Sequence, residues 1–309
     1  MKVFESVVLP CLAIGVAALT TLWGANWVRV EPTSRNNTSL TFTTIDVPGA
    51  AVTEITGINS SGELVGFYGQ NVSEDIHGFV YTGGNFTYFD YPGLSVTVPN
   101  GINDSGVIVG YATQLPSLRS SVVGFTYDGS SFTTLKDASD QATYGYGINN
   151  IGVVVGNAGS LDYTRGFRMR NGRYTALHFP GTYFNASGTG INNHNVLVGY
   201  TVLGGVYNAY VYAAGAFTNI DVSGAQATSA SAINDSGIVV GWYNPVSTNY
   251  YYGFAWKNGT TLTFGVPGAV WTAAYGINAF GQIVGAYSLD DGVTWHGFLT
   301  NPVALPRPR

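Results

Sequence analysis

One short phrase recurs six times in the sequence, at a nearly constant interval, and it constrains the fold more than any other feature. The phrase reads Gly-Ile-Asn-x-x-Gly-x, followed by two branched aliphatic residues and a further Gly. Successive phrases lie 42 to 46 residues apart, and they start at Gly57, Gly101, Gly147, Gly190, Ala232 and Gly276. Self-similarity at such a period is the signature of a repeat architecture, in which each repeat is one supersecondary unit.

Each phrase is predicted to form a tight turn between two strands. In the first repeat Asn59 enters the turn, where its side chain can bond backbone groups two residues on, and Gly62 leaves it with a positive φ. The fourth repeat has Asn195 where the first has Gly62. Asn tolerates the left-handed backbone region better than most residues. We therefore expect this position to be selected for backbone conformation rather than for chemistry.

Four segments with strand character make up each repeat. The first runs into the phrase and the second follows it. The third carries a small residue and then an aromatic residue, as in Gly78-Phe79. The fourth alternates and usually ends at a Pro-Gly or Gly turn, as in Thr41–Gly49. We expect the Gly of the second segment to lie against the aromatic residue of the third segment or against the neighbouring blade, because glycine inside a strand often marks a close approach.

This pattern predicts an all-β fold, a six-bladed β-propeller of four-stranded antiparallel blades. The array begins with a lone fourth segment and ends with the first three segments of a repeat. The N-terminal strand is therefore expected to pair with the last blade and close the ring, which would remove the exposed strand edges of an open array.

The domain organisation follows from composition. Residues 1–28 contain the uncharged apolar run from Val7 to Val28, and we expect a signal peptide or an N-terminal membrane anchor there. Residues 29–39 are predicted to be a linker, 40–301 the propeller and 302–309 a C-terminal tail. The only cysteine, Cys11, lies in the apolar run, so no disulfide is expected in the propeller.

The charge balance restricts the partners. Charged residues make up only 9% of the chain and the net charge is −5. We find no basic stripe along the sequence and expect no nucleic-acid partner. Contact with a membrane is expected only through the N-terminal segment, if it is retained.

Several repeat phrases resemble those of the HAF-repeat family of extracellular repeat proteins. They are His77–Phe79, His296–Phe298 and Phe217–Val222, and the resemblance covers about residues 40–300. It implies an exported protein, extracellular, at the cell surface or in a periplasm, and it brings no assigned activity. Four repeats depart from the family at the His position, which is occupied there by Val123, Arg165, Asn208 and Tyr252.

The loops between the second and third segments, and between the fourth segment and the next repeat, differ in length and sequence. In a propeller both sets emerge on one face, here called the variable face, and loops of this kind carry function. Aromatic residues on them offer rigid contact area for a sugar or a protein partner. The candidates for ligand binding are Trp271, Trp295, Tyr144, Tyr183, Tyr207, Tyr250 and Tyr251. The alternative is that several of them pack between blades.

A second candidate site is an acidic cluster on loops of the first and last repeats. Carboxylates there, with His77 and His296 nearby, would be able to hold a divalent cation. The residues of this candidate metal site are Glu74, Asp75, Asp290 and Asp291. Solvated loop carboxylates are the alternative, and we expect no cofactor.

No motif for nucleophilic, metalloprotease or phosphate-loop chemistry occurs in the chain. The sequence therefore favours a non-enzymatic exported repeat protein that binds a glycan or a protein through its variable face. Two alternatives stay open: a lyase or hydrolase with an active site at the channel mouth, and a structural cell-surface protein.

Overall fold

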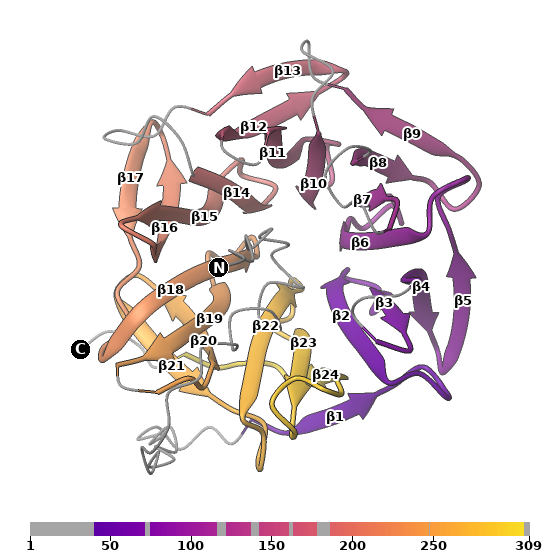
Figure 1. Ribbon diagram of the computed structural model, residues 1–309. Helices are drawn as coiled ribbons and strands as arrows, with labels where there is room; N and C mark the ends of the chain where they lie inside the picture. Colours follow the sequence, from indigo (N-terminus) through magenta and orange to yellow (C-terminus); the bar gives the residue numbers. More distant parts are fainter. Residues whose placement is uncertain are drawn as a thin grey trace, which may run out of the picture.

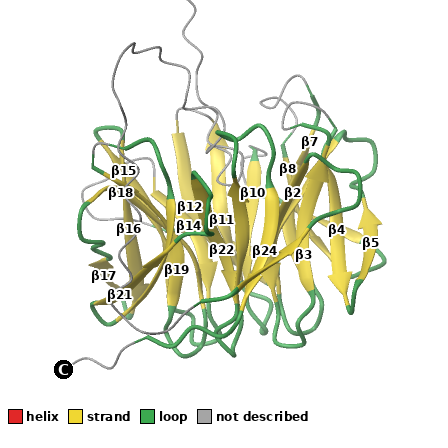
Figure 2. Ribbon diagram, turned by 90° about the horizontal axis from the view of Figure 1, so that it is seen from below, coloured by secondary structure: helices red, strands yellow, loops and turns green. Residues whose placement is uncertain are grey.

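The computed structural model describes residues 40–71, 75–115, 122–136, 142–160, 163–177, 186–246 and 248–305. These residues form strands that run between two opposite faces of the molecule, and turns and loops join the strands at both faces (Figure 2). None of them belongs to a helix of the length and apolarity needed to cross a bilayer. The predicted signal or anchor and the linker, residues 1–39, lie outside the described part of the chain.

The described residues contain four strands for each repeat. The inner strands are β2 (Val52–Ile58), β6 (Val96–Ile102), β10 (Thr143–Ile148), β14 (Ala186–Ile191), β18 (Ala225–Ile233) and β22 (Trp271–Ile277). The second strands are β3 (Leu64–Gly69), β7 (Ile108–Thr113), β11 (Val154–Ser160), β15 (Leu197–Leu203), β19 (Val239–Pro245) and β23 (Ile283–Ser288). The third strands are β4 (His77–Thr82), β8 (Val123–Tyr127), β12 (Tyr163–Arg170), β16 (Val206–Ala213), β20 (Tyr252–Lys257) and β24 (His296–Thr300). The outer strands are β1 (Phe42–Ile45), β5 (Asn85–Phe89), β9 (Phe132–Leu135), β13 (Arg173–Ala176), β17 (Ala216–Asn219) and β21 (Thr260–Phe264).

The strands form antiparallel sheets arranged around a central axis. Strands β2–β5, β6–β9 and β18–β21 form three four-stranded sheets, and β22–β24 form a fourth together with β1. Strands β10–β17 form one eight-stranded sheet, whose two halves are joined by a single parallel pair, Arg165 with Ala186. Figure 1 shows strands such as β2, β6, β10 and β22 facing the centre, and β1, β5, β9 and β13 on the outside. The protein is thus a β-propeller with four-stranded antiparallel blades.

The first described strand lies beside the last. Strand β1 pairs antiparallel with β24, and Phe42 stands opposite Thr300. Beyond this pairing, Nδ1 of His296 lies 2.8 Å from Oδ2 of Asp46, and the Gly297 amide donates to Asp46 Oδ1 at 3.2 Å. These contacts join segments 250 residues apart.

The phrase asparagines form the turns as predicted. Oδ1 of Asn59 accepts hydrogen bonds from the backbone amides of Ser61 and Glu63, at 3.1 and 3.0 Å. Gly62 has a φ of 83°, and Asn195, at the same position in the fourth repeat, has a φ of 61°. The prediction that this position is selected for the left-handed backbone region is confirmed.

The same asparagine side chains also connect neighbouring turns. Each Nδ2 donates to the backbone carbonyl of the phrase asparagine in the next repeat, over 3.0 to 3.4 Å. All six residues are buried. The resulting asparagine ring consists of Asn59, Asn103, Asn149, Asn192, Asn234 and Asn278, and Asn278 donates back to Asn59. Because buried amides are costly to leave unpaired, this ring ties the turns together.

The glycine of each second strand is required by close packing. A Cβ atom on Gly199 would overlap the carbonyl oxygen of Ser187 and would lie 2.6 Å from the hydroxyl of Tyr210. In the first repeat, a Cβ on Gly66 would lie 2.7 Å from the ring of Phe79. The predicted contact with the third-strand aromatic residue is confirmed. The inner-strand carbonyl is an additional contact, at a bulge where the register shifts.

Candidate functional site

A continuous series of aromatic rings crosses three neighbouring groups of strands, β14–β17, β18–β21 and β22–β24. We call it the aromatic arc. Successive ring centroids lie 5.1 to 6.1 Å apart, with mostly tilted or edge-on geometry, as favoured for aromatic pairs. The arc consists of Tyr200, Tyr207, Trp242, Tyr251, Trp271 and Trp295.

The members of the arc differ in their exposure. Tyr207, Trp242 and Tyr251 are half-buried, so part of each ring faces solvent. Trp271 and Trp295 are 3% and 2% exposed and support the exposed rings from beneath. The arc therefore presents a partly open aromatic surface on a rigid aromatic base.

The expectation that Trp271 and Trp295 lie exposed on loops is wrong, because both side chains are buried. Trp271 opens β22, its Nε1 donates to the carbonyl of Asn249 at 3.2 Å, and Gly292 packs directly on its ring. Trp295 donates its Nε1 to the carbonyl of Gly292 at 3.1 Å. Both indoles are buried because their residues pair with a neighbouring sheet, Trp271 with Tyr251 and Trp295 with Val52.

The remaining aromatic candidates also differ in burial. Tyr144 is 9% exposed and packs edge-on against Tyr111, at a centroid distance of 5.2 Å, so it belongs to the core rather than to the surface. Tyr250 is half-buried beside Tyr251. Tyr183 lies outside the described residues.

Sequence analysis missed Trp242, the central ring of the arc. Trp242 follows the glycine of the second strand β19, and residues after that glycine point away from the third-strand aromatic, because neighbouring strand residues face opposite sides. The repeat alignment held the signal, since Tyr200 occupies the same position in β15. A search of loops alone could not find it.

Burial raises the pKa of the Tyr207 hydroxyl, and the neighbouring Tyr251 raises it further. Burial also raises the pKa of Tyr251. A tyrosine hydroxyl is protonated at neutral pH even at its ordinary pKa, so both groups can donate a hydrogen bond to a ligand.

Exposed aliphatic side chains lie on the same three groups of strands as the arc. They lie on or beside the loops between second and third strands, on the variable face. Their exposed fractions range from 42% to 72%, and they are Leu203, Val206, Val246, Leu289 and Val293.

The candidate metal site is not assembled among the described residues. No group of three or more His, Cys, Asp or Glu side chains comes together in that part of the chain. Asp290 accepts hydrogen bonds from the Thr294 amide and hydroxyl, at 2.9 and 2.7 Å, and Asp75 and Asp291 are exposed. Glu74 lies outside the described residues.

The two histidines next to that candidate site face other carboxylates. Nδ1 of His77 lies 3.0 Å from Asp90, and His296 contacts Asp46. Each pair connects a third strand to the end of the neighbouring outer strand. Each histidine thus contacts a carboxylate at the end of the neighbouring outer strand of its own sheet, and neither is left as a ligand for the hypothetical metal site.

Glu54 is the only acidic residue on the described inner strands, and it is 1% exposed. Burial raises the pKa of its carboxyl well above the ordinary value, and a hydrogen bond with Tyr275 lowers it in part. Its Oε2 atom has no hydrogen-bond partner in the described structure. A single carboxyl does not provide the acidic pair that glycoside hydrolysis commonly uses.

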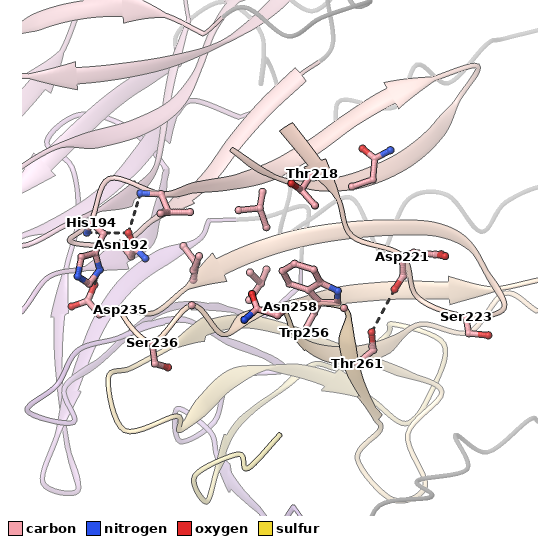
Figure 3. Close-up of a pocket in the computed structure, with 17 residues that line it drawn as sticks. Asn192, His194, Thr218, Asp221, Ser223, Asp235, Ser236, Trp256, Asn258 and Thr261 are labelled. Atoms are coloured by element: carbon pink, nitrogen blue, oxygen red, sulfur yellow. Dashed lines mark hydrogen bonds and ion pairs between the residues drawn. The ribbon is translucent and has the colours of Figure 1, made fainter. Parts of the chain in front are cut away.

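A groove of about 940 Å³ opens between the strands β14–β17 and β18–β21. It is lined on the turn face, opposite the variable face, by His194, Ser236 and Asn258 from tight turns. Figure 3 shows Asp235 and His194 at one end, Asp221 and Ser223 at the other, and Trp256 between them. Sequence analysis did not predict this groove, because its residues come from different repeats.

Basic residues are concentrated on one hairpin, which corrects the expectation that no basic stripe exists. Six lysines and arginines fall within the described residues, and four of these lie on β12 and β13. These four are Arg165, Arg168, Arg170 and Arg173. All four lie within the nine residues 165–173 of the sequence, and the hairpin places three of them on one face.

The fold has clear counterparts among solved structures, although no family model and no characterised protein matches the sequence. TolB from Acinetobacter baumannii superposes with a TM-score of 0.55 at 9% identity, covering 79% of this chain and 65% of TolB. The chain therefore spans slightly less than two thirds of that protein. A protein assigned as TolB from Agrobacterium tumefaciens gives 0.53 at 13% identity, covering 82% and 91% of the two chains.

A protein assigned as a gluconolactonase gives a TM-score of 0.52 at 11% identity, covering 85% of this chain and 92% of the other. At these identities the likeness establishes the β-propeller fold alone. The function has to be argued from the site.

Proposed function

We propose that this chain is an exported, non-enzymatic six-bladed propeller that binds a protein partner through its variable face. The observation that carries the proposal is the aromatic arc, together with exposed aliphatic side chains on the same three groups of strands. Aromatic and aliphatic groups dominate the centres of protein interfaces, while charged residues are depleted there.

Six blades are supported by a recurring contact between sheets. Single parallel pairs join Ile76 to Val96, and Tyr251 to Trp271, between separate sheets. Each links the start of a third strand to the start of the next inner strand. The pair between Arg165 and Ala186 has the same place. The eight-stranded sheet is accordingly read as two blades in contact.

Closure of the ring is supported at the boundary between the last blade and the first. The parallel pair of Val52 with Trp295 repeats the contact made between other blades. Strand β1 adds the outer strand of the last blade, and Asn278 donates to Asn59. With the ring closed in this way, the strands that carry the arc form a fixed surface.

The arc is preorganised for binding. Its half-buried rings already contact one another, so a partner would not have to order them, and little conformational entropy would be lost on association. The exposed aliphatic tips would gain from the removal of their apolar area from water, at about 25 cal/mol per Å².

Export is supported by the apolar run between Val7 and Val28, which follows Lys2. The repeat phrases support placing the chain with the HAF-repeat proteins, whose members are extracellular.

A glycan is the second candidate ligand, because the open faces of Tyr207, Trp242 and Tyr251 suit the apolar face of a sugar ring. The exposed aliphatic residues favour the protein partner over it, since a sugar gains little from Val293 or Leu289.

Affinity enrichment tests the proposal. Purified wild-type protein and the variants Trp242→Ala and Tyr251→Ala are used as baits in an extract of the cells that make it, with enriched proteins quantified by mass spectrometry. We expect one partner to be enriched by the wild type and to fall at least about tenfold with each variant. The matched control is Phe280→Ser, which removes a 65% exposed aromatic residue from the turn face and should leave enrichment unchanged.

A glycan array probed with the same proteins separates the two ligand classes. A glycan bound by the wild type and lost in both arc variants, without an enriched protein, would replace the protein partner by a sugar. Enrichment that is equal for the wild type and both arc variants would contradict the assignment of the arc.

A further inference from the structure

The hairpin of β12 and β13 presents three arginines on one exposed face. Asn171 and Gly172 form its two-residue turn with φ values of 49° and 73°, and Arg170 stands directly opposite Arg173. Arg168 lies two residues before Arg170 and therefore on the same face. All three are exposed, and none of their guanidinium groups has a hydrogen bond or an ion pair within the described structure.

This arrangement is unfavourable in the isolated chain. Like charges directly opposite each other across two strands are destabilising, and side chains at such positions lie about 5 Å apart. An acidic partner on the three guanidinium groups would reverse the sign of that contribution. Binding of an acidic partner to these arginines is therefore expected to be favourable.

Protection of a sheet edge does not account for the arginines. Charged residues often keep outer strands from pairing with other chains. Yet the other outer strands, which face solvent in the same way, carry neither lysine nor arginine: β1 reads FTTI, β5 NFTYF, β9 FTTL, β17 AFTN and β21 TTLTF. The concentration on one hairpin therefore requires a separate explanation.

The groove of Figure 3 carries acidic side chains, so its charge is complementary to that of the three arginines. Its lining includes Asp221 near one end and Asp235 near the other, and neither lysine nor arginine. The two oxygens of Asp235 accept hydrogen bonds from the Asn193 amide and side chain, at 2.8 and 2.7 Å, and each keeps a further acceptor position. The half-buried indole of Trp256 lies between the two carboxylates. Carboxylates bind guanidinium groups in paired hydrogen bonds, and an indole face attracts them as well.

We propose that the arginine hairpin of one copy of this chain docks into the acidic groove of a second copy. Arg170 and Arg173, at the hairpin tip, would enter the groove over Trp256, and the carboxylates of Asp221 and Asp235 would pair with the guanidinium groups.

The positions of the two elements predict a closed dimer. The tip of the hairpin is a turn between a third and an outer strand, so it lies on the turn face. The groove opens on that face at the turns that hold His194, Ser236 and Asn258, and it extends to Asp221 in the loop between β17 and β18. With two turn faces opposed across a two-fold axis, each hairpin can meet the other copy's groove. Such isologous pairs are the commonest oligomers.

This dimer uses none of the residues of the aromatic arc, because the groove is lined by other side chains. Either proposal can fail while the other stands.

Sedimentation equilibrium of the purified protein in low salt tests the proposal. We expect a monomer–dimer equilibrium that shifts toward monomer as salt rises, because exposed ion pairs are screened. The double variants Arg170→Glu/Arg173→Glu and Asp221→Asn/Asp235→Asn should each raise the dimer dissociation constant by about tenfold or more. Lys136→Glu, also a charge reversal of an exposed residue, is the control and should not change it.

Mixing the two double variants gives the sharper result. Each alone lacks one half of both contacts, whereas a mixed pair keeps one intact hairpin and one intact groove. We therefore expect dimers in the mixture at concentrations where either variant alone is monomeric. Melting curves that match the wild type establish that both variants are folded.

The proposal is overturned if the wild type stays monomeric at every concentration in low salt. It is also overturned if a dimer forms but the two double variants dimerise as well as the wild type, or if their mixture shows no recovery.

Discussion

The side-chain amide of Asn278 donates a hydrogen bond to the backbone carbonyl of Asn59, 3.4 Å away and 219 residues distant in sequence. This bond completes the asparagine ring, in which every phrase turn is bonded to the next. Each asparagine also stabilises its own turn through Oδ1. One residue type therefore performs two tasks, and a substitution can separate them.

Replacing Asn234 by Asp keeps the acceptor that serves the turn and removes the donor that reaches Asn278, 3.0 Å away. At neutral pH the new carboxylate faces a carbonyl oxygen, so we expect a loss of roughly 1–3 kcal/mol in the free energy of unfolding.

A protonated Asp at position 234 can donate again. Its folded-state pKa should lie above the unfolded value, so stability is retained at acid pH and lost as pH rises through the folded pKa. Urea denaturation at several pH values measures this. Asn234→Ala should lose stability at every pH, and an equally pH-independent loss in Asn234→Asp would count against the ring.

Two glycines of the fourth repeat should respond differently to alanine. A Cβ on Gly199 overlaps the Ser187 carbonyl and the Tyr210 hydroxyl, whereas a Cβ on Gly188 meets Leu177 Cδ1 at 3.4 Å and Val155 Cβ at 3.7 Å, both near ordinary contact distance. We expect Gly199→Ala to destabilise by about 3 kcal/mol or more and Gly188→Ala to change stability by less than about 1 kcal/mol. Thermal melts of the two variants decide the matter, and a similar melting temperature for both would refute the packing assigned to the second strands.

Glu54 should make stability depend on pH. Its folded-state pKa is raised by burial, so the folded state holds a proton that the unfolded state has already lost. Stability is therefore highest below the unfolded pKa of Glu and falls as pH rises from there toward the folded pKa. Glu54→Gln should abolish this fall and gain stability relative to the wild type at pH 8 but not at pH 4. Parallel pH profiles for the two proteins would contradict the buried, protonated carboxyl.

Removal of β1 should be far more damaging than trimming of the other end. Strand β1 pairs with β24 along its length and places Phe42 against Phe298, at a centroid distance of 5.6 Å. A chain that begins after Gly49 would expose β24 as an open edge, and we expect its melting temperature to drop by ten degrees or more, on the order of several kcal/mol. A chain lacking residues 306–309 is the control. Equal melting temperatures for the two truncated chains would mean that the propeller does not depend on the pairing of β1 with β24.

Much of the fold was accessible from the sequence because the repeat records backbone geometry. The turn glycine at position 62 and its replacement at Asn195 fixed the turns, and the strands came out close to their predicted bounds. The asparagine ring was not predicted. Its bonds run between repeats, and a pattern within one repeat contains no information on which atoms of the next lie within 3 Å.

The site was less accessible for a related reason. Trp271 and Trp295 were expected on exposed loops, yet both residues pair with a neighbouring sheet and both indoles are buried. Trp242 belongs to a strand and still reaches the partly open surface. Likewise the groove is formed by residues of two neighbouring repeats, whereas the arginine hairpin lies within nine residues of the sequence. Exposure depends on tertiary packing, which local sequence reports poorly.

Photo-crosslinking from the variable face tests the central claim most directly. A photoreactive amino acid is placed at Val293, 72% exposed beside the arc, and separately at Phe280, 65% exposed on the turn face. In cells that make the protein, the account predicts one discrete crosslinked partner from position 293, which disappears when Trp242 is also changed to Ala. The same partner from both positions, or an adduct at position 293 that persists without Trp242, would contradict it.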